Sequence, residues 1–306
     1  MSLTTCSDSF KRGINWLELN LEKTEILAQT IPNNESMKDS MNDGEKPVNS
    51  LQDIKYGCFY IEFFDLLSKI NSPLVEDFQK AALYDEFWDF DWLVENVNTV
   101  NMFIKLGLGD NVILKEVIEQ TKKDQTVEGF LPFDIIGHTG SMWALYNVNK
   151  NSKEFLNALN YWSNFYANFQ NEYEIGMSSL GIIVLYFYDD ILYKKVISSG
   201  VDFLKRIQNN EGMWGTSVQK DNYRDSFYSI WALILTNGIN DPSVCKCLDF
   251  IRKEQLENGS WNNNTSDTMY ALNILLSVGE GPKISVEFMN NQMSMMNKKL
   301  EKSLQQ

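Results

Sequence analysis

The chain alternates segments in which apolar residues recur with helical spacing and short segments rich in glycine and polar residues. The clearest pattern is an internal repeat, because residues 201–214 match residues 248–261 without a gap, at an offset of 47. Both copies contain Q-x-x-x-G-x-W, and each is followed by a second apolar segment that ends near a glycine. We predict that the repeating unit is a helix, a Gln/Gly/Trp turn and another helix.

The turn residues are predicted to have structural roles. Glycine permits a backbone with positive φ where one helix reverses into the next. A glutamine amide can bond free backbone groups at helix ends, and a tryptophan ring can cover it against water. Asp225 with Ser226, and Asp267 with Thr268, are expected to cap the helix that follows. The structural repeat residues are Gln208, Gly212, Trp214, Gln255, Gly259 and Trp261.

Weaker copies of the repeat occur earlier in the chain. Residues 125–131 keep the glutamine and the glycine but have Leu131 in the place of tryptophan. Residues 159–176 form a more degenerate copy, and residues 13–17 resemble residues 200–204. The array is therefore expected to begin almost at the N-terminus, with helices throughout.

We predict one domain over residues 1–285, with the repeats spanning about residues 8–285. Residues 31–50 have little apolar periodicity and are expected to form a mobile surface loop. Residues 286–306 are expected to form a C-terminal tail or one further helix. With only 6 prolines and 17 glycines to interrupt the apolar pattern, the predicted fold class is all-α.

The doubled Q-x-x-x-G-x-W, with each copy followed by Asp and Ser or Thr, resembles the QW repeat of a known superfamily. Its members are squalene-hopene cyclases, class II diterpene cyclases and protein-prenyltransferase β-subunits. The resemblance implies an α/α toroid, in which an inner ring of helices surrounds a cavity and an outer ring covers it. It extends over most of the chain and is sharpest over residues 200–280, and the length of the chain suffices for one such domain.

Composition and charge narrow the function classes. The apolar content of 43% is that of a globular protein with a substantial core. A net charge of -14 argues against general electrostatic binding to nucleic acid or to an anionic bilayer. The N-terminus lacks a secretory pattern and no segment reaches about 18 uninterrupted apolar residues, so we expect a cytoplasmic protein without a transmembrane segment. The four cysteines are expected to be free thiols.

The strongest candidate for catalysis is an acidic and aromatic segment at residues 84–92. Class II cyclases carry D-x-D-D, whose middle Asp protonates an alkene or epoxide, and Asp89-Phe90-Asp91 matches its first three positions. The resemblance implies that Asp91 is the acid and Asp89 its partner, although Trp92 replaces the fourth acid. Two carboxyls in an apolar pocket resist joint ionisation, so one can keep a proton. The alternative is a helix start with acidic caps and core aromatics.

Aromatic side chains are the candidates for substrate binding, because their π faces stabilise carbocations and form apolar surfaces. Inside a toroid they would line the cavity, but the same residues could equally be packing. The predicted substrate-binding residues are Phe87, Trp88, Trp92, Trp143, Tyr228, Trp231 and Tyr270.

No metal or cofactor is predicted. Asp189-Asp190 resembles the start of a magnesium-binding D-D-x-x-D but lacks the final acid, and a solvated turn is the favoured interpretation. A zinc site would need Cys245 and Cys247 to converge with His138, the only histidine, and no spacing indicates this. The residues around His138 are better explained as a helix start.

The leading hypothesis is a class II-like terpenoid cyclase, of isomerase or lyase type, that acts on a small apolar isoprenoid-like ligand. One alternative is a non-catalytic toroid that binds an apolar ligand or a protein partner. A further alternative is a carbohydrate-active α/α toroid, since glycosidases and lyases use such folds with paired carboxylates.

Overall fold

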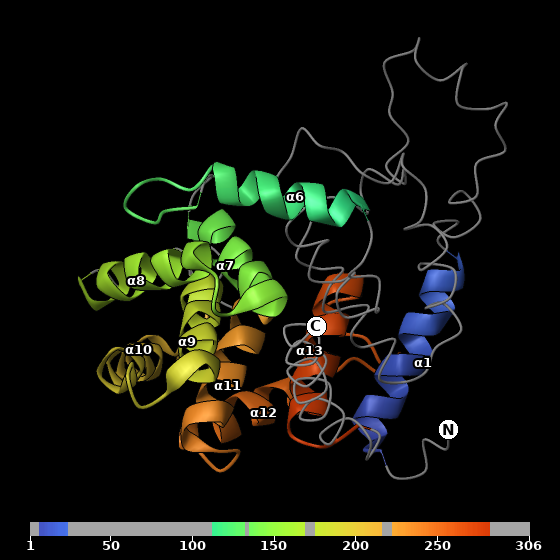
Figure 1. Cartoon of the computed structure of the whole chain (residues 1–306). Coiled ribbons are helices and arrows are strands. Elements are labelled where there is room, and N and C mark those ends of the chain that lie inside the picture. Colours follow the sequence, from blue (N-terminus) through green and yellow to red (C-terminus); the bar gives the residue numbers. More distant parts are fainter. Residues whose placement is uncertain (1–5, 24–111, 132–134, 169–174, 216–221, 282–306) are drawn as a thin grey trace, which may run out of the picture.

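The computed structural model describes residues 6–23, 112–131, 135–168, 175–215 and 222–281. Within these ranges every regular element is an α-helix and no strand occurs, so the all-α prediction is confirmed there. The helices are α1 (Asp8–Lys23), α6 (Val112–Lys123), α7 (Ile135–Asn149), α8 (Lys153–Asn168), α9 (Ile175–Asp189), α10 (Lys194–Ile207), α11 (Tyr223–Asn237), α12 (Pro242–Lys253) and α13 (Thr265–Ser277) (Figure 1).

Two predicted segments, the loop at 31–50 and the tail at 286–306, lie outside the described residues. Among the helices that are described, none is long and apolar enough to cross a membrane.

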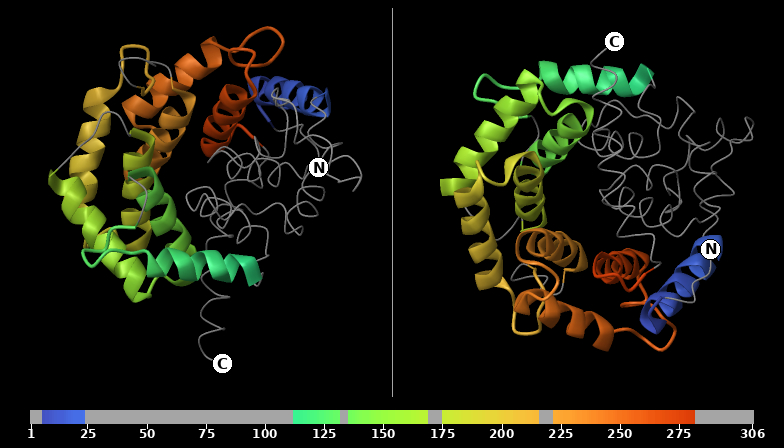
Figure 2. Two further views of the ribbon diagram at one scale, coloured as in Figure 1. Left: turned by 90° about the horizontal axis from the view of Figure 1, so that it is seen from above. Right: turned by 60° about the horizontal axis from the view of Figure 1, so that its bottom comes forward.

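The helices form two curved layers. Helices α7, α9, α11 and α13 pack side by side in chain order as an inner layer. Helices α6, α8, α10, α12 and α1 follow one another along the outside of the curve (Figure 2). Outer helix α8 packs on inner helix α7, which precedes it, and in the same way α10 packs on α9 and α12 on α11. The chain therefore alternates between the two layers, as the helix-turn-helix repeat predicts.

The burial pattern explains why the layers form. Outer helix α10 buries Ile197, Val201 and Leu204 on one stripe and exposes lysine, arginine and aspartate on the rest of its surface. Inner helix α13, by contrast, buries every residue from Thr268 to Leu276. An apolar stripe needs one covered face, whereas a helix that is apolar all round needs neighbours on several sides.

The glutamine of each repeat joins one outer helix to the next. The Gln208 amide Nε2 donates to the Gly212 carbonyl in its own turn, at 2.8 Å, and to the Ser243 carbonyl, also at 2.8 Å. Ser243 is the second residue of α12. The degenerate copy behaves in the same way, since Gln125 Nε2 donates to Gly129 and, at 2.7 Å, to Glu154, the second residue of α8. The amide therefore fixes a corner between successive outer helices.

The repeat glycines allow the turn to approach the next outer helix. Gly129, Gly212 and Gly259 all have φ between 95° and 102°, which is the left-handed region that favours glycine. A Cβ on Gly212 would lie 2.7 Å from the carbonyl of Lys246, the fifth residue of α12. A side chain at this position would therefore strain the backbone and push the turn away from α12.

The repeat tryptophans cover the corners from inside the core. Trp214 Nε1 donates to the Leu204 carbonyl at 2.8 Å, and Trp261 Nε1 donates to the Ile251 carbonyl at 2.7 Å. Both rings are fully buried. Each tryptophan backbone N–H donates to a hydroxyl on the following inner helix, either Ser226 Oγ or Thr268 Oγ1. The three predicted motif residues thus have structural roles.

One detail of the predicted caps is wrong. The N-caps of α11 and α13 are Asn222 and Asn264, whose side-chain oxygens accept the backbone N–H groups of Asp225 and Asp267. These aspartates are the third residues of their helices, and the adjacent hydroxyl residues serve the tryptophan backbone instead of the helix end. Asparagine satisfies the same free N–H groups that aspartate was expected to satisfy.

The N-terminal helix occupies the position of the next outer helix after α12. Gln255 Nε2 donates to its own turn at Gly259, at 2.9 Å, and to the carbonyl of Ser9, the second residue of α1, at 2.8 Å. A Cβ on Gly259 would collide with the carbonyl of Arg12, the fifth residue of α1. Helix α1 also packs on inner helix α13. The last repeat therefore binds the start of the chain through the contacts that it would make to a following repeat.

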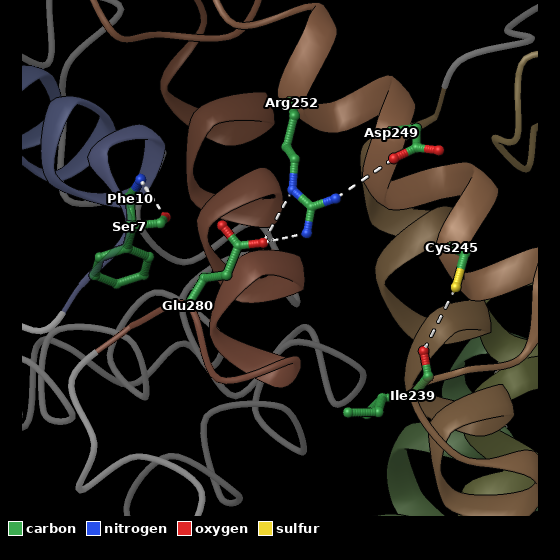
Figure 3. A network of polar contacts seen from close by, with 7 residues as sticks. All are labelled: Ser7, Phe10, Ile239, Cys245, Asp249, Arg252 and Glu280. Atoms are coloured by element: carbon green, nitrogen blue, oxygen red, sulfur yellow. Dashed lines mark hydrogen bonds and ion pairs between the residues drawn. The ribbon is translucent and has the colours of Figure 1, made fainter.

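Further contacts hold this junction on the outside. The Ser7 backbone N–H donates to the Glu280 carbonyl at 2.9 Å. Figure 3 shows Arg252 of α12 at the Glu280 carboxylate, to which its Nε donates at 3.0 Å. Phe10, which is fully buried, lies against Gly281. The residues that follow α13 are thus tied to both α12 and α1.

The paired roles of the glutamines predict matched losses of stability. Gln208→Leu and Gln255→Leu should each lower the free energy of unfolding by about 1–3 kcal/mol, because each removes the donor to two backbone carbonyls. Gln120→Leu, which removes an exposed bond from α6 to Asp124 directly after it, should change it by no more than about 0.5 kcal/mol. Urea titrations followed by circular dichroism would measure the three variants.

If Gln208→Leu lowered the free energy of unfolding and Gln255→Leu left it unchanged, α1 and α12 would not be equivalent partners of the repeat.

Candidate functional site

A continuous row of aromatic side chains crosses the inner layer. Its members are Trp143 of α7, Phe187 of α9, Trp231 and Phe227 of α11, and Tyr270 of α13. Ring centroids are 6.2 Å apart between Trp143 and Trp231, and 6.0 Å apart both between Trp231 and Phe227 and between Phe227 and Tyr270. Phe187 contacts both tryptophans, at 6.2 and 6.5 Å. These distances are within the range of favourable aromatic contacts. We call these five residues the aromatic row.

The aromatic row lies on the concave side of the inner layer. Helix α9 separates α7 from α11, and outer helices α8 and α10 cover its outer side. Trp143 and Trp231 come from α7 and α11, so they can meet only by passing in front of α9 on the concave side. Trp231 and Phe187 are only partly buried, whereas Ile230, on another face of α11, is fully buried. The row therefore lies on the concave side of the curved layer, where Trp143, Phe227 and Tyr270 are buried and Trp231 and Phe187 are partly exposed.

The position of these rings depends on the repeat. Inner helices α9 and α11 run in parallel, since the first turn of α9 meets the first turn of α11 at Gly176 and Asp225. Further along, Ser179 and Ser229 lie 3.1 Å apart through their hydroxyl oxygens. Equivalent positions on successive inner helices therefore stand at the same height, and side chains there can touch.

A buried acid lies beside the first turns of these helices. Asp225 is 3% exposed, and its Oδ1 accepts the Gly176 backbone N–H at 3.2 Å. Burial raises the pKa of Asp225, while Arg224, with Nη2 at 3.7 Å from Oδ1, and the Gly176 N–H act in the opposite direction. This carboxyl links α9 to α11 and lies within one helical turn of Phe227 and Tyr228 in the chain. Its hydrogen bonds explain it as a packing residue at the edge of the row.

The structure brings together four residues that the sequence singled out. Trp143, Trp231 and Tyr270 belong to the aromatic row, and Tyr228 contacts it through Phe227, at a centroid distance of 5.2 Å. Phe187 was missed by the sequence analysis. Its helix, α9, is apolar on all sides, so no periodicity marks the inward face.

Other predicted site residues lie outside the described part of the chain. They are the proposed acids and the aromatic residues beside them, Asp89, Asp91, Phe87, Trp88 and Trp92.

His138 belongs to a corner of the fold. It is the fourth residue of α7 and is 1% exposed, and its Nδ1 accepts the Leu131 backbone N–H at 3.0 Å. Leu131 stands where the other repeats have tryptophan, and at those corners a hydroxyl accepts the same N–H. His138 therefore replaces the serine or threonine of the repeat. The predicted helix start around His138 is confirmed, and the lone pair that a general base would need is used by the fold.

The surroundings of His138 keep it uncharged. Its ring stacks on Phe130 at 5.3 Å and contacts Tyr161 at 5.2 Å and Trp162 at 6.0 Å. Burial lowers the pKa of His138 to about 4, and a weaker effect of the Ala158 backbone opposes this. The imidazole is therefore neutral near pH 7 and remains a hydrogen-bond acceptor.

The other metal candidates also have structural explanations. Cys245 and Cys247 both lie within α12 and point in different directions, since Cys245 is exposed and Cys247 is buried against Met213. Asp189, the last residue of α9, and Asp190 are exposed at the predicted turn, where Asp189 Oδ1 accepts the Leu192 N–H at 2.8 Å. Within the described ranges, no three His, Cys, Asp or Glu side chains are grouped to hold a metal ion.

The buried histidine predicts a specific pH dependence. The pKa of His138 is about 4 in the folded chain, against 6.5 for an unperturbed histidine, so only the unfolded chain gains this proton as the pH falls from 6.5 towards 4. The free energy of unfolding should drop by about 3 kcal/mol between pH 6.5 and pH 4, with no further loss from this group at lower pH. His138→Thr restores the hydroxyl of the other repeats and should remove this part of the pH dependence.

Urea titrations of wild type and His138→Thr at several pH values would measure the difference. The threonine variant should be less stable at pH 7, because a smaller side chain leaves a cavity among three aromatic rings. If the difference in free energy of unfolding between the two proteins stayed the same from pH 7 to pH 4, the buried imidazole would not be neutral as proposed.

No protein-family model matches the chain, and no curated protein matches its sequence. The function is therefore inferred from the repeat, the aromatic row and the acidic segment.

Proposed function

We propose that the chain closes into an α/α toroid of the terpenoid-cyclase and prenyltransferase kind. The support is the junction between α12 and α1, where Gln255 binds the N-terminal helix with the contacts that Gln208 makes to α12. An open array has no reason to bind its first helix as if it were the next repeat. Outer helices α6, α8, α10, α12 and α1 already follow one another around most of a turn (Figure 2).

The interior of this toroid binds an apolar, isoprenoid-like chain. The observation that carries this proposal is the aromatic row, which four successive inner helices build on their concave side. Branched hydrocarbon chains pack well on aromatic faces, and such faces also stabilise positive charge that develops on carbon. The row contains no basic side chain, so nothing in it repels a cation.

The reaction is a cyclisation that starts by protonation. Asp91 gives its proton to an alkene or epoxide of the substrate, and Asp89 holds the acid in its protonated state by resisting joint ionisation. Phe87, Trp88 and Trp92 add aromatic faces next to the acid, and the resulting carbocation is passed to the double bonds of the same chain. When the final cation loses a proton, substrate and product are isomers. The support for these roles is the resemblance of residues 89–91 to the cyclase motif.

A non-catalytic toroid is the second candidate, and Trp92 favours it. In the cyclase motif the fourth position is an acid, and its replacement by an indole removes one of the groups that tune the proton donor. Such a protein would bind the apolar chain, or a protein partner that carries one, and release it unchanged.

Mass spectrometry after incubation with farnesyl, geranylgeranyl and longer prenyl substrates would separate the two candidates. A new isomer supports the cyclase, and binding without a product supports the carrier. Asp91→Asn should abolish turnover, because the amide has no acidic proton, while the helical circular dichroism and the melting temperature stay nearly unchanged. Full activity in Asp91→Asn would exclude Asp91 as the acid, and absence of binding by the wild-type protein would reject both candidates.

A further inference from the structure

Helix α1 lies on the last repeat without a turn that connects the two. Three other outer helices follow the inner helix on which they pack after a short turn: α8 follows α7 after residues 150–152, α10 follows α9 after residues 190–193, and α12 follows α11 after residues 238–241. Helix α1 packs on α13, but the bond between Gln255 and Ser9 joins residues 246 positions apart in the chain. Non-covalent contacts therefore decide which helix occupies this position.

The apolar face of α1 fits the last repeat closely. Phe10 and Ile14, which lie one helical turn apart, are at most 1% exposed. At Gly13, a Cβ would lie 2.8 Å from Leu272 Cδ2 and 3.0 Å from Trp261 Cζ3. The backbone of α1 therefore approaches side chains of the repeat directly, and a large side chain at position 13 would push the helix away.

Polar contacts fix the register of α1 on the last repeat. Arg12, the fifth residue of α1, donates through Nη2 to Gln255 Oε1 at 2.6 Å. Lys246, the fifth residue of α12, donates through Nζ to the Asn209 carbonyl of the preceding turn at 2.9 Å. Both outer helices thus use a basic side chain at the same position to bind the turn before them. The contacts that select α1 come from residues 7–14, which form one short segment.

The surface that α1 covers consists of α13, the turn at residues 254–264 and residues 279–281, and we call it the α1 seat. We propose that the α1 seat is a docking site that also binds helix α1 of a second copy of this chain. Two copies that exchange their α1 helices fill both seats with the contacts seen within one chain, so the exchanged dimer loses none of them. This inference concerns the seat alone and does not depend on which ligand the chain binds.

Protein concentration determines which copy supplies the helix. The helix of the same chain has a higher effective concentration at the seat than the helix of another copy in dilute solution. The monomer therefore prevails in dilute solution, and exchange increases with protein concentration or when a chain cannot use its own helix.

Two full-length variants with complementary defects test the proposal. Gly13→Phe places a ring where a Cβ is already within 3.0 Å of Trp261, so it disables α1 and leaves the seat intact. Gly259→Val places its Cβ 2.4 Å from the Arg12 carbonyl oxygen, so it disables the seat and leaves α1 intact. Each variant alone should be monomeric. An equimolar mixture should form a 1:1 dimer, seen as a doubled molar mass by size-exclusion chromatography with light scattering.

The matched control replaces Gly259→Val in the mixture by a double variant that carries Gly13→Phe as well. This mixture contains no intact α1 and should stay monomeric. Circular dichroism would show that each variant keeps its helices. A mixture of the two folded single variants that stays monomeric would overturn the proposal, and so would a dimer formed equally well with the double variant.

Wild-type protein decides the question if either single variant does not fold. Tagged and untagged copies refolded together from urea should give a dimer that contains both, in an amount that rises with protein concentration. This dimer should persist on dilution for longer than mixing takes, because each copy must release a seated helix before the two separate. Absence of a mixed dimer at every concentration would show that α1 serves only its own chain.

Discussion

The curvature of the molecule depends on one hydrogen-bonded group, the side-chain amide of the repeat glutamine. A primary amide has two N–H donors, and here one binds the carbonyl of its own turn and the other binds the second residue of the next outer helix. Backbone carbonyls have two lone pairs, so the helix can accept this bond without losing its own. Because the same two hydrogen bonds recur at each corner, successive hairpins are placed alike, and similar placement of successive units produces a curve.

The curvature of the inner layer determines which side chains meet. Side chains on the concave side of parallel inner helices converge, and those at equivalent positions of the repeat stand at one height. Trp143 and Trp231 therefore meet although another helix separates their own. The same repeat that makes the scaffold thus provides the regular spacing of the aromatic row.

The sequence predicted the corners well and the inner surface only in part. Gln208 and Gln255 were recognisable because a turn requires the same residues in each copy, and their surroundings proved equivalent. The inward face of α9 was not recognisable, since a helix covered on several sides is apolar all round and gives no periodic signal. The role of Asn222 as the N-cap was missed because asparagine and aspartate are both favoured at N-caps, and Asp225 was taken for the cap. The roles of Asp89 and Asp91 stay predictions.

The corner at Leu131 shows which part of the repeat is indispensable. Tryptophan is absent there, yet Gln125 makes both of its bonds and Gly129 keeps its positive φ. The backbone N–H at this position still needs an acceptor, because a buried N–H without one is costly. His138 supplies that acceptor, and its ring on Phe130 brings aromatic packing to a corner without the indole. The corner therefore requires a hydrogen-bond acceptor for this N–H and side chains that fill the core. Here His138 and Phe130 together provide what the hydroxyl and the indole provide at the other corners. Because different residues can meet these physical requirements, the repeat can diverge in sequence and keep its structure.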